Sequence, residues 1–155
     1  MDQTRLLDRL RGQCSRREYC EADIRRKISA EEAKCGFPLG ADAIIASLKE
    51  DNYLSDARFA EAFARDKSSL DGWGSLKIRC ALQARGLAKA DIDAGLAAID
   101  EASASGRLEK LVLAKHRLLA DDPQCRLKLL KYALDAGYSY DEADAAVRLA
   151  MGKDK

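Results

Sequence analysis

Three glycines at almost equal spacing constrain the fold of this chain more than any other feature. Gly36 and Gly86 are 50 residues apart, and Gly86 and Gly137 are 51 apart. Each is followed at once by an apolar residue, and each is preceded by an apolar pair at helical spacing: Ile24 and Ile28, Ile78 and Leu82, and Leu129 and Ala133. A glycine just past the last periodic residue, with an apolar contact after it, is typical of a helix that ends in the left-handed conformation. We therefore predict that the three glycines cap the C-termini of three helices.

The segments on either side of these capped helices also recur. After each glycine comes a short amphipathic segment that starts with acidic residues, at 41–50, 90–101 and 141–150. Acidic side chains offset the exposed amide dipoles of a first helical turn, so each segment is predicted to begin a new helix. A further segment with helical apolar periodicity precedes each capped helix. The breaks between the first and second helices are expected at Cys14–Ser15, 68–74 and 121–123.

The fold class follows from this recurrence. We predict an all-α protein of three tandem three-helix repeats of about 50 residues, at 1–52, 53–104 and 105–152, stacked into an elongated, curved array with a C-terminal tail at 153–155. Composition agrees, because the chain has 27 Ala and 21 Leu but only 2 Val, 1 Thr and 2 Pro, and strands favour β-branched residues. A single unit buries too little surface to be stable alone, so its neighbours must complete the core. The alternative is an ordinary helical bundle in which the glycine spacing is coincidental.

Charge alternates along the chain, although the net charge of the 155 residues is only +1. Segments 1–35, 53–90 and 107–131 hold 9, 7 and 7 basic side chains against 7, 4 and 3 acidic ones. Segments 36–52, 91–106 and 132–152 hold 1, 0 and 1 basic side chains against 3, 4 and 4 acidic ones. If the repeats stack in register, basic helices would lie along one side of the molecule and acidic helices along another. An alternation of solvated charges without a partner is the competing interpretation.

Basic side chains on and near the capped helices are the candidate interaction residues. Arg25, Arg26 and Lys27 are consecutive, so they fan over most of the solvent face of their helix and are not expected all to be paired locally. The predicted patch, which would face a protein filament or DNA, also includes Arg58, Arg65, Lys77, Arg79, Arg85, Lys128 and Lys131, with Arg126 close to the last two. Such side chains often only cover apolar surface with their stems. Trp73, in the loop before one capped helix, is either a core residue or an exposed anchor, and the usual burial of Trp favours packing.

No motif of enzymatic chemistry occurs in the sequence. It lacks the G-x-x-x-x-G-K-[ST], G-x-S-x-G and H-E-x-x-H patterns, has a single histidine, His116, and has five cysteines without a C-x-x-C pair. We therefore expect no enzymatic activity, no cofactor, no metal site and reduced thiols. No apolar run approaches the roughly 20 residues that span a bilayer, and the N-terminus has no signal-peptide pattern. We expect a cytoplasmic protein with no membrane contact.

Several stretches together are similar to one known family. They are YLSDARFAEAF at 53–63, GWGSLKIR at 72–79 and LQARGL at 82–87, preceded by SRREYCE at 15–21 and IRRKI at 24–28, and followed by KLLKY at 128–132 and AGYSYD at 136–141. Over roughly residues 10–145 the chain resembles the RecX family, regulators of the bacterial recombinase RecA. It departs from the family pattern at Ser55, where an acidic residue is usual, at Ala81, where Glu is frequent, and by four extra residues between Ile28 and Gly36. Ser55 can still cap a helix, so the fold expectation is unchanged.

The resemblance implies a non-enzymatic function. Members of the family lie along the groove of the RecA filament on single-stranded DNA and suppress ATP hydrolysis, strand exchange and self-cleavage of the SOS repressor. The expected partners are thus the RecA filament and, weakly or through the filament, single-stranded DNA, with this chain a monomer and without a cofactor. A direct DNA-binding protein and a helical-repeat scaffold for another protein are the alternatives.

Overall fold

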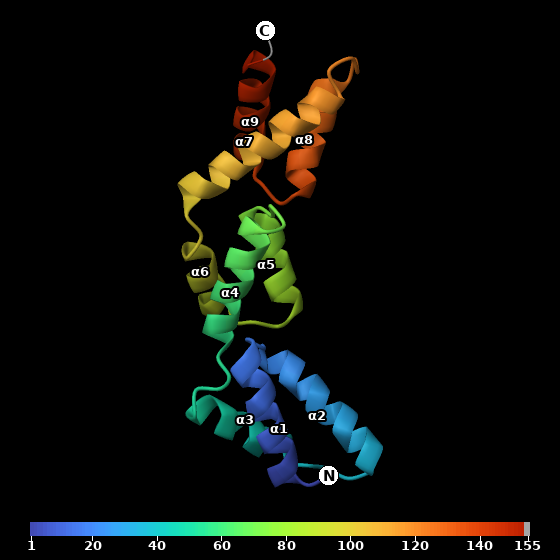
Figure 1. Cartoon of the computed structure of the whole chain (residues 1–155), viewed down its shortest axis with the longest axis vertical. Coiled ribbons are helices and arrows are strands. Elements are labelled where there is room, and N and C mark those ends of the chain that lie inside the picture. Colours follow the sequence, from blue (N-terminus) through green and yellow to red (C-terminus); the bar gives the residue numbers. More distant parts are fainter. Residues whose placement is uncertain (154–155) are drawn as a thin grey trace.

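The computed structural model describes residues 1–153, which form α-helices joined by short loops (Figure 1). The helices are α1 (Gln3–Arg16), α2 (Glu21–Cys35), α3 (Ala41–Glu50), α4 (Asp56–Ser69), α5 (Ser75–Ala84), α6 (Lys89–Ala97), α7 (Glu101–Leu118), α8 (Cys125–Asp135) and α9 (Tyr140–Lys153). No strand occurs within residues 1–153. The prediction of an all-α fold is confirmed.

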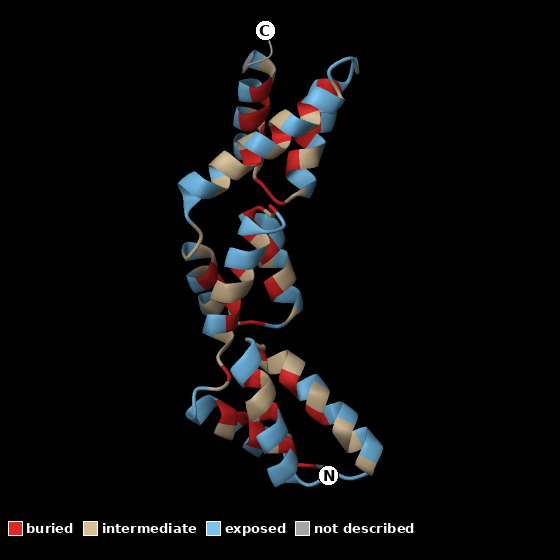
Figure 2. Ribbon diagram, viewed as in Figure 1, coloured by how far each residue is buried: buried red, intermediate tan, exposed pale blue. Residues whose placement is uncertain are grey.

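Each successive group of three helices has its own buried core, which Figure 2 shows on the inward faces of the helices. We call α1–α3, α4–α6 and α7–α9 the first, second and third units. The apolar pairs that the sequence placed before the three glycines, Ile24 and Ile28, Ile78 and Leu82, and Leu129 and Ala133, are all fully buried, two in each core. Helical periodicity therefore identified the inward face of the middle helix in every unit.

Near the predicted limit between the first two repeats, each repeat contributes a residue to the core of the other. Cys20, in the first predicted repeat, is fully buried in the second core, whereas Leu54, in the second predicted repeat, packs in the first core. Helix α7 already begins at Glu101 and α9 continues to Lys153, while residues 154–155 of the predicted tail lie outside the described residues. The limits 1–52, 53–104 and 105–152 stay a prediction.

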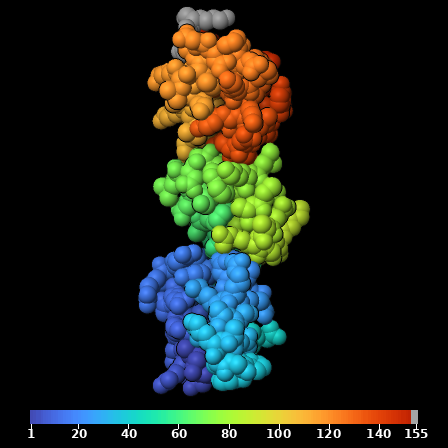
Figure 3. All heavy atoms as spheres, turned by 90° about the vertical axis from the view of Figure 1, so that its right-hand side faces the viewer, coloured from blue at the N-terminus to red at the C-terminus, as the bar shows by residue number. Residues whose placement is uncertain are grey.

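The three units are stacked end to end into an elongated body (Figures 1 and 3). We call the contact between the first and second units the first joint, and the contact between the second and third units the second joint. The stack agrees with the expectation from unit size, since each unit covers surface that its neighbour would otherwise expose.

The start of α4 agrees with the sequence, whereas the end of α1 does not. The Ser55 hydroxyl accepts a hydrogen bond from the Arg58 amide at 3.2 Å, so this departure from the family pattern does cap α4. The expected break at Cys14–Ser15 is wrong, because α1 continues to Arg16. Cys14 lies one turn beyond buried Leu10 on the same face and is itself buried, so packing extends the helix by a further turn.

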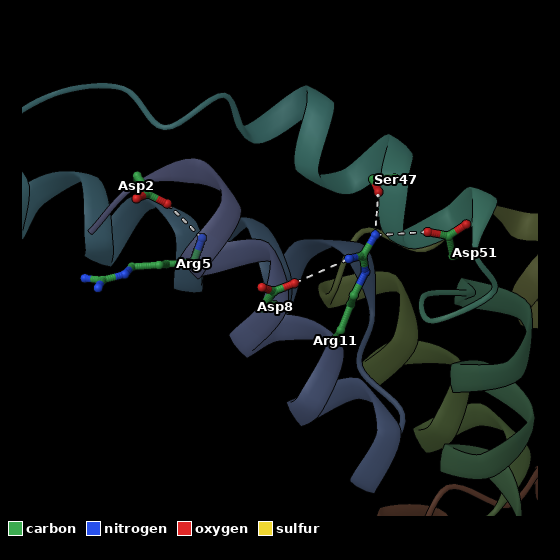
Figure 4. Close-up of polar contacts among 6 residues, drawn as sticks. All are labelled: Asp2, Arg5, Asp8, Arg11, Ser47 and Asp51. Atoms are coloured by element: carbon green, nitrogen blue, oxygen red, sulfur yellow. Dashed lines mark hydrogen bonds and ion pairs between the residues drawn. The ribbon is translucent and has the colours of Figure 1, made fainter.

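Arg11 connects the first and third helices of the first unit (Figure 4). Its guanidinium donates to the Asp51 carboxylate at 3.1 Å and to the Ser47 hydroxyl at 3.4 Å, both near the end of α3, and to Asp8 at 3.4 Å on its own helix. This arginine holds the fold together and is not available to a partner.

Candidate functional site

The second helix of each unit lies on the same side of the elongated body. In Figure 1, α2, α5 and α8 are on the right and α3 and α6 are on the left, and Figure 3 looks directly onto the right-hand side. We call the exposed side chains of α2, α5 and α8 the second-helix face. The second helices of the three units thus share one side of the molecule.

Many of the cations on this face are nevertheless paired within the chain. In each unit an arginine of the second helix forms an ion pair with an aspartate of the third helix. The pairs are Arg25 with Asp42 at 3.0 Å, Arg79 with Asp93 at 2.9 Å, and Arg126 with Asp144 at 2.8 Å. The hydrogen bonds from Arg79 and Lys89 lower the pKa of Asp93, which keeps its carboxylate ionised. These arginines fasten the second helix to the third.

Of the consecutive cations Arg25, Arg26 and Lys27, the two arginines are paired locally, whereas Lys27 has no ion pair among residues 1–153, so not all three are paired, as expected. Arg25 also contacts Glu21 at 3.4 Å, Arg26 forms an ion pair with Asp23, and the Lys27 ammonium lies 5.0 Å from the centre of the Tyr19 ring. Both carboxylates stand three or four residues before their arginine, which is the spacing of neighbours on a helix surface. The sequence spacing therefore already indicated that Arg25 and Arg26 have acidic partners on their own helix.

Other members of the predicted patch hold the first joint or their own segment. Arg58 reaches back to Glu18 at 3.1 Å, and Arg85 reaches Asp23 at 3.3 Å, so both join the second unit to the first. Arg85 also lies 5.4 Å from the centre of each of the Phe59 and Phe63 rings. Within their own units, Arg65 pairs with Glu61 at 2.7 Å and Lys128 pairs with Asp122.

Two lysines of the predicted patch remain exposed without an ion pair to any residue of the described chain. Lys77, on α5, lies 4.4 Å from the centre of the Trp73 ring, and Lys131, on α8, is exposed. Exposed leucines accompany them, with Leu76 50% exposed and Leu127 65% exposed. Each of these leucines stands two residues before a buried core residue of its helix, so the two are at equivalent positions.

Gly36, Gly86 and Gly137 follow helix ends with φ of +80°, +78° and +99°, which is the left-handed region. Gly137 does more than cap α8, because it forms the second joint. Its carbonyl accepts a hydrogen bond from the Leu76 amide at 3.0 Å, and the preceding Ala136 carbonyl accepts one from the Gly74 amide at 2.7 Å. A β-carbon on Gly137 would lie 2.3 Å from that of Lys77. The spacing of the glycines predicted the cap at Gly137 but not this direct contact between the backbones of two units.

Trp73 is partly buried, and its packing is that of a core residue, which the sequence favoured. It packs against the second core, with its ring edge-on to Phe63 at a centroid distance of 6.3 Å. It also contributes to a cavity of about 630 Å³ at the second joint, where Tyr138 from the third unit is fully buried and donates a hydrogen bond to the Gly72 carbonyl at 3.0 Å. Trp73 is therefore a core residue with one open side.

The metal-ligating side chains were compared with the expectations from the sequence. Within the described part of the chain, no group of three or more His, Cys, Asp or Glu residues could hold a metal ion. All five cysteines are free thiols. Among residues 1–153, no helix combines the length and the apolar character that crossing a membrane requires.

The chain is similar to RecX proteins in sequence. Residues 55–96, which include α4, α5 and most of α6, match the model of the second three-helix domain of RecX. The Regulatory protein RecX of Pseudomonas putida (strain KT2440) is 31% identical over 141 residues, which are 90% of this chain and 85% of that protein. The Regulatory protein RecX of Cronobacter sakazakii is 34% identical over 101 residues, which are 61% of each protein, and the alignments to two Clostridium botulinum relatives cover half of those proteins.

Solved structures share the fold. The crystal structure of RecX from Lactobacillus salivarius superimposes with a TM-score of 0.82 at 16% identity and covers 96% of both chains. A second crystal structure of a regulatory protein RecX gives a TM-score of 0.78 at 21% identity, and it covers 99% of this chain and 72% of the other. The tandem helical architecture is therefore that of these proteins.

Proposed function

The chain belongs to the RecX family, and from this premise we propose that it is a non-enzymatic regulator of the RecA recombinase. It binds the filament that the recombinase forms on single-stranded DNA, and it inhibits ATP hydrolysis, strand exchange and the coprotease activity that leads to cleavage of the SOS repressor. It acts in DNA repair as a cytoplasmic monomer and needs no cofactor.

The observation that carries this proposal is the placement of three equivalent helices along one side of an elongated body. A filament built from identical protomers offers an equivalent surface at every step. A ligand that repeats its own surface at regular intervals suits such a partner better than it suits a single globular protein. The second-helix face is the surface that repeats in this way.

Regulation then follows from binding across protomer boundaries. A ligand that contacts several protomers at once has a higher affinity for one filament geometry than for another. It shifts the population of filaments toward that geometry by no more than this difference in affinity. No chemical step by this chain is needed.

The free groups of the second-helix face provide the test. Because Arg25, Arg79 and Arg126 are paired inside the chain, their replacement would disturb the fold as well as the surface. Lys77 and Lys131 are exposed and have no ion pair among residues 1–153, so the K77E/K131E double variant breaks no ion pair. It does remove the contact of the Lys77 ammonium with the Trp73 ring, so circular dichroism and Trp73 fluorescence check that the second joint is kept. R5E/K110E is the matched control, since Arg5 on α1 and Lys110 on α7 are also exposed and without an ion pair in that range.

We expect K77E/K131E to weaken co-sedimentation with recombinase filaments by roughly tenfold or more, and R5E/K110E to bind like the wild type. In a pulldown from a nuclease-treated lysate, we expect the wild type to retain the recombinase as its main partner. Equal weakening by both variants would refute the proposed face. Loss of the recombinase after nuclease treatment would refute direct binding to it.

A further inference from the structure

An apolar hollow lies at the second joint, where the loop between α4 and α5 meets α7. This loop forms the upper end of the second unit in Figure 1. The hollow has a volume of about 310 Å³, and its apolar residues are Leu70 from the loop and Leu111 and Ala114 from α7. The loop lies directly on α7, because a β-carbon on Gly72 would come within 2.8 Å of the Leu111 side chain. An occupant of the hollow would therefore contact both the second and the third unit.

The hollow continues into an apolar stripe along α7. Ala114 and Leu118 stand three and seven residues after Leu111, so the three side chains share one face of the helix. Leu70 is 78% exposed and Leu118 is 80% exposed, more than any other large apolar side chain of residues 1–153. Neither belongs to one of the three cores. Exposed apolar surface with a polar border is typical of an interaction site.

Basic side chains border the stripe on one side. At about 100° per residue, Lys110 and Arg117 lie on the same flank of α7, next to Ala114. Both are exposed, and neither has an ion pair with a residue of the described chain. The acidic residues of α7, Glu101 and Glu109, do not lie on this flank. The flank therefore carries two positive charges that no carboxylate of α7 balances.

The other charged side chains of the hollow already have partners. Arg107 donates a hydrogen bond to the Ser68 hydroxyl at 2.7 Å, which fixes its guanidinium at the second joint. Asp71 forms an ion pair with Lys67 at 2.9 Å, so its negative charge is balanced from α4. The net charge around the hollow is therefore positive. We call the surface made of Leu70, Lys110, Leu111, Ala114, Arg117 and Leu118 the α7 groove.

We infer that the α7 groove binds an acidic amphipathic helix of a partner protein, with one large apolar side chain in the hollow and carboxylates against Lys110 and Arg117. A helix of this kind binds through apolar residues at positions i, i+3 or i+4, and i+7, and Leu111, Ala114 and Leu118 present the same spacing to it. Carboxylates of the partner complement the two cations, and basic partners are repelled. Leucines without an open aromatic ring favour such a helix over single-stranded nucleic acid, whose bases stack on rings.

The α7 groove is separate from the second-helix face. Its residues are on α7 and on the loop before α5, whereas Lys77 and Lys131, which serve the proposed function, are on α5 and α8. Binding of an acidic helix to the α7 groove therefore does not require the recombinase.

The test uses the full chain without recombinase or DNA. A phage-displayed library of random peptides, each about 15 residues long so that an isolated helix can form, is selected on the immobilised protein. The most enriched peptide is then synthesised with a fluorescent label, and its binding to the protein in solution is followed by anisotropy. We expect the library to enrich peptides that have a net negative charge and Leu or Phe at helical spacing.

Paired variants locate the binding on the surface. The groove variants are K110E/R117E and L118S, and the matched controls, which make the same changes on α5 and α8, are K77E/K131E and L127S. Leu127 is a suitable control for Leu118 because it is also largely exposed. Unchanged helical circular dichroism checks that all four variants fold.

We expect K110E/R117E to lower the affinity for the peptide about tenfold or more and L118S to lower it about fivefold, with less than about twofold change in the controls. K110E/R117E should still co-sediment with recombinase filaments like the wild type, so failure of filament binding and failure of the α7 groove are seen separately. Enrichment of no peptide above the K110E/R117E background, enrichment of basic peptides, or equal losses in groove and control variants would each overturn the inference. Displacement of the peptide by oligothymidylate as readily as by unlabelled peptide would also overturn it and would assign the groove to nucleic acid.

Discussion

The contact between Gly74 and Gly137 makes the second joint sensitive to a single methyl group. In a Gly137→Ala variant the new β-carbon would meet the β-carbon of Lys77 at 2.3 Å, its amide nitrogen at 2.7 Å and the Gly74 carbonyl oxygen at 3.0 Å. Two of these three atoms belong to backbone, which cannot move aside as a side chain can. The second and third units must therefore separate.

The expected cost has two parts. Alanine at φ of +99° costs about 1–2 kcal/mol because its β-carbon crowds the backbone in the left-handed region. Separation of the units also weakens the hydrogen bonds from Gly74 to Ala136 and from Leu76 to Gly137, at about 0.5–1.5 kcal/mol each. We expect a total loss of about 3 kcal/mol.

Gly86→Ala is the matched control. Gly86 has nearly the same role after α5, with φ of +78°, but a β-carbon there would meet nothing within 4 Å. Only the backbone cost of about 1–2 kcal/mol applies. The assay is urea unfolding followed both by circular dichroism and by the fluorescence of Trp73, which is the single tryptophan and lies at the second joint. Equal destabilisation by the two alanines would refute the view that Gly137 forms a joint.

Three further predictions concern single side chains. Tyr138→Phe should destabilise the protein by about 1–2 kcal/mol in urea unfolding, since it leaves the buried Gly72 carbonyl without its donor, and an unchanged midpoint would contradict this. Asp23 has a lowered pKa in the folded chain, so its contribution to stability is complete above the ordinary aspartate range and is lost as the pH falls through the lowered value. The difference in unfolding free energy between wild type and Asp23→Asn should therefore shrink on acidification. A constant difference would argue against the role of Asp23 at the first joint. Cys80 is exposed, whereas burial raises the pKa of the Cys14, Cys20 and Cys125 thiols. When the folded protein is treated with a maleimide, mass spectrometry should therefore find Cys80 labelled before these three. Equally fast labelling of Cys20 would mean that the first joint opens readily.

Features that depend on neighbouring residues in the sequence were predictable. The glycine positions, the buried faces of the middle helices and the cap at Ser55 all follow from spacings of a few residues. The pairing of Arg26 with Asp23 belongs to the same class, because the two residues are three apart on one helix, and sequence reasoning missed it only by considering the basic residues alone.

Features that depend on the stacking of units were not predictable. Arg85 and Asp23 are 62 residues apart, and no local pattern indicates that they meet at the first joint. The backbone contact of Gly137 is of the same kind, since the cap explains the glycine completely until the neighbouring unit is in place. Charge counts located the basic segments, but they could not separate cations that hold the fold from those without an ion pair.

The most direct test of the proposed function is the rate of ATP hydrolysis by the cognate recombinase on single-stranded DNA, with this protein titrated below equimolar amounts. Excess free DNA in a parallel reaction separates binding to the filament from competition for DNA. We expect the wild type to inhibit hydrolysis at substoichiometric ratios, and this inhibition to persist with excess DNA. The K77E/K131E variant should not inhibit hydrolysis. Undiminished hydrolysis, or inhibition that spare DNA abolishes, would contradict direct regulation of the recombinase filament.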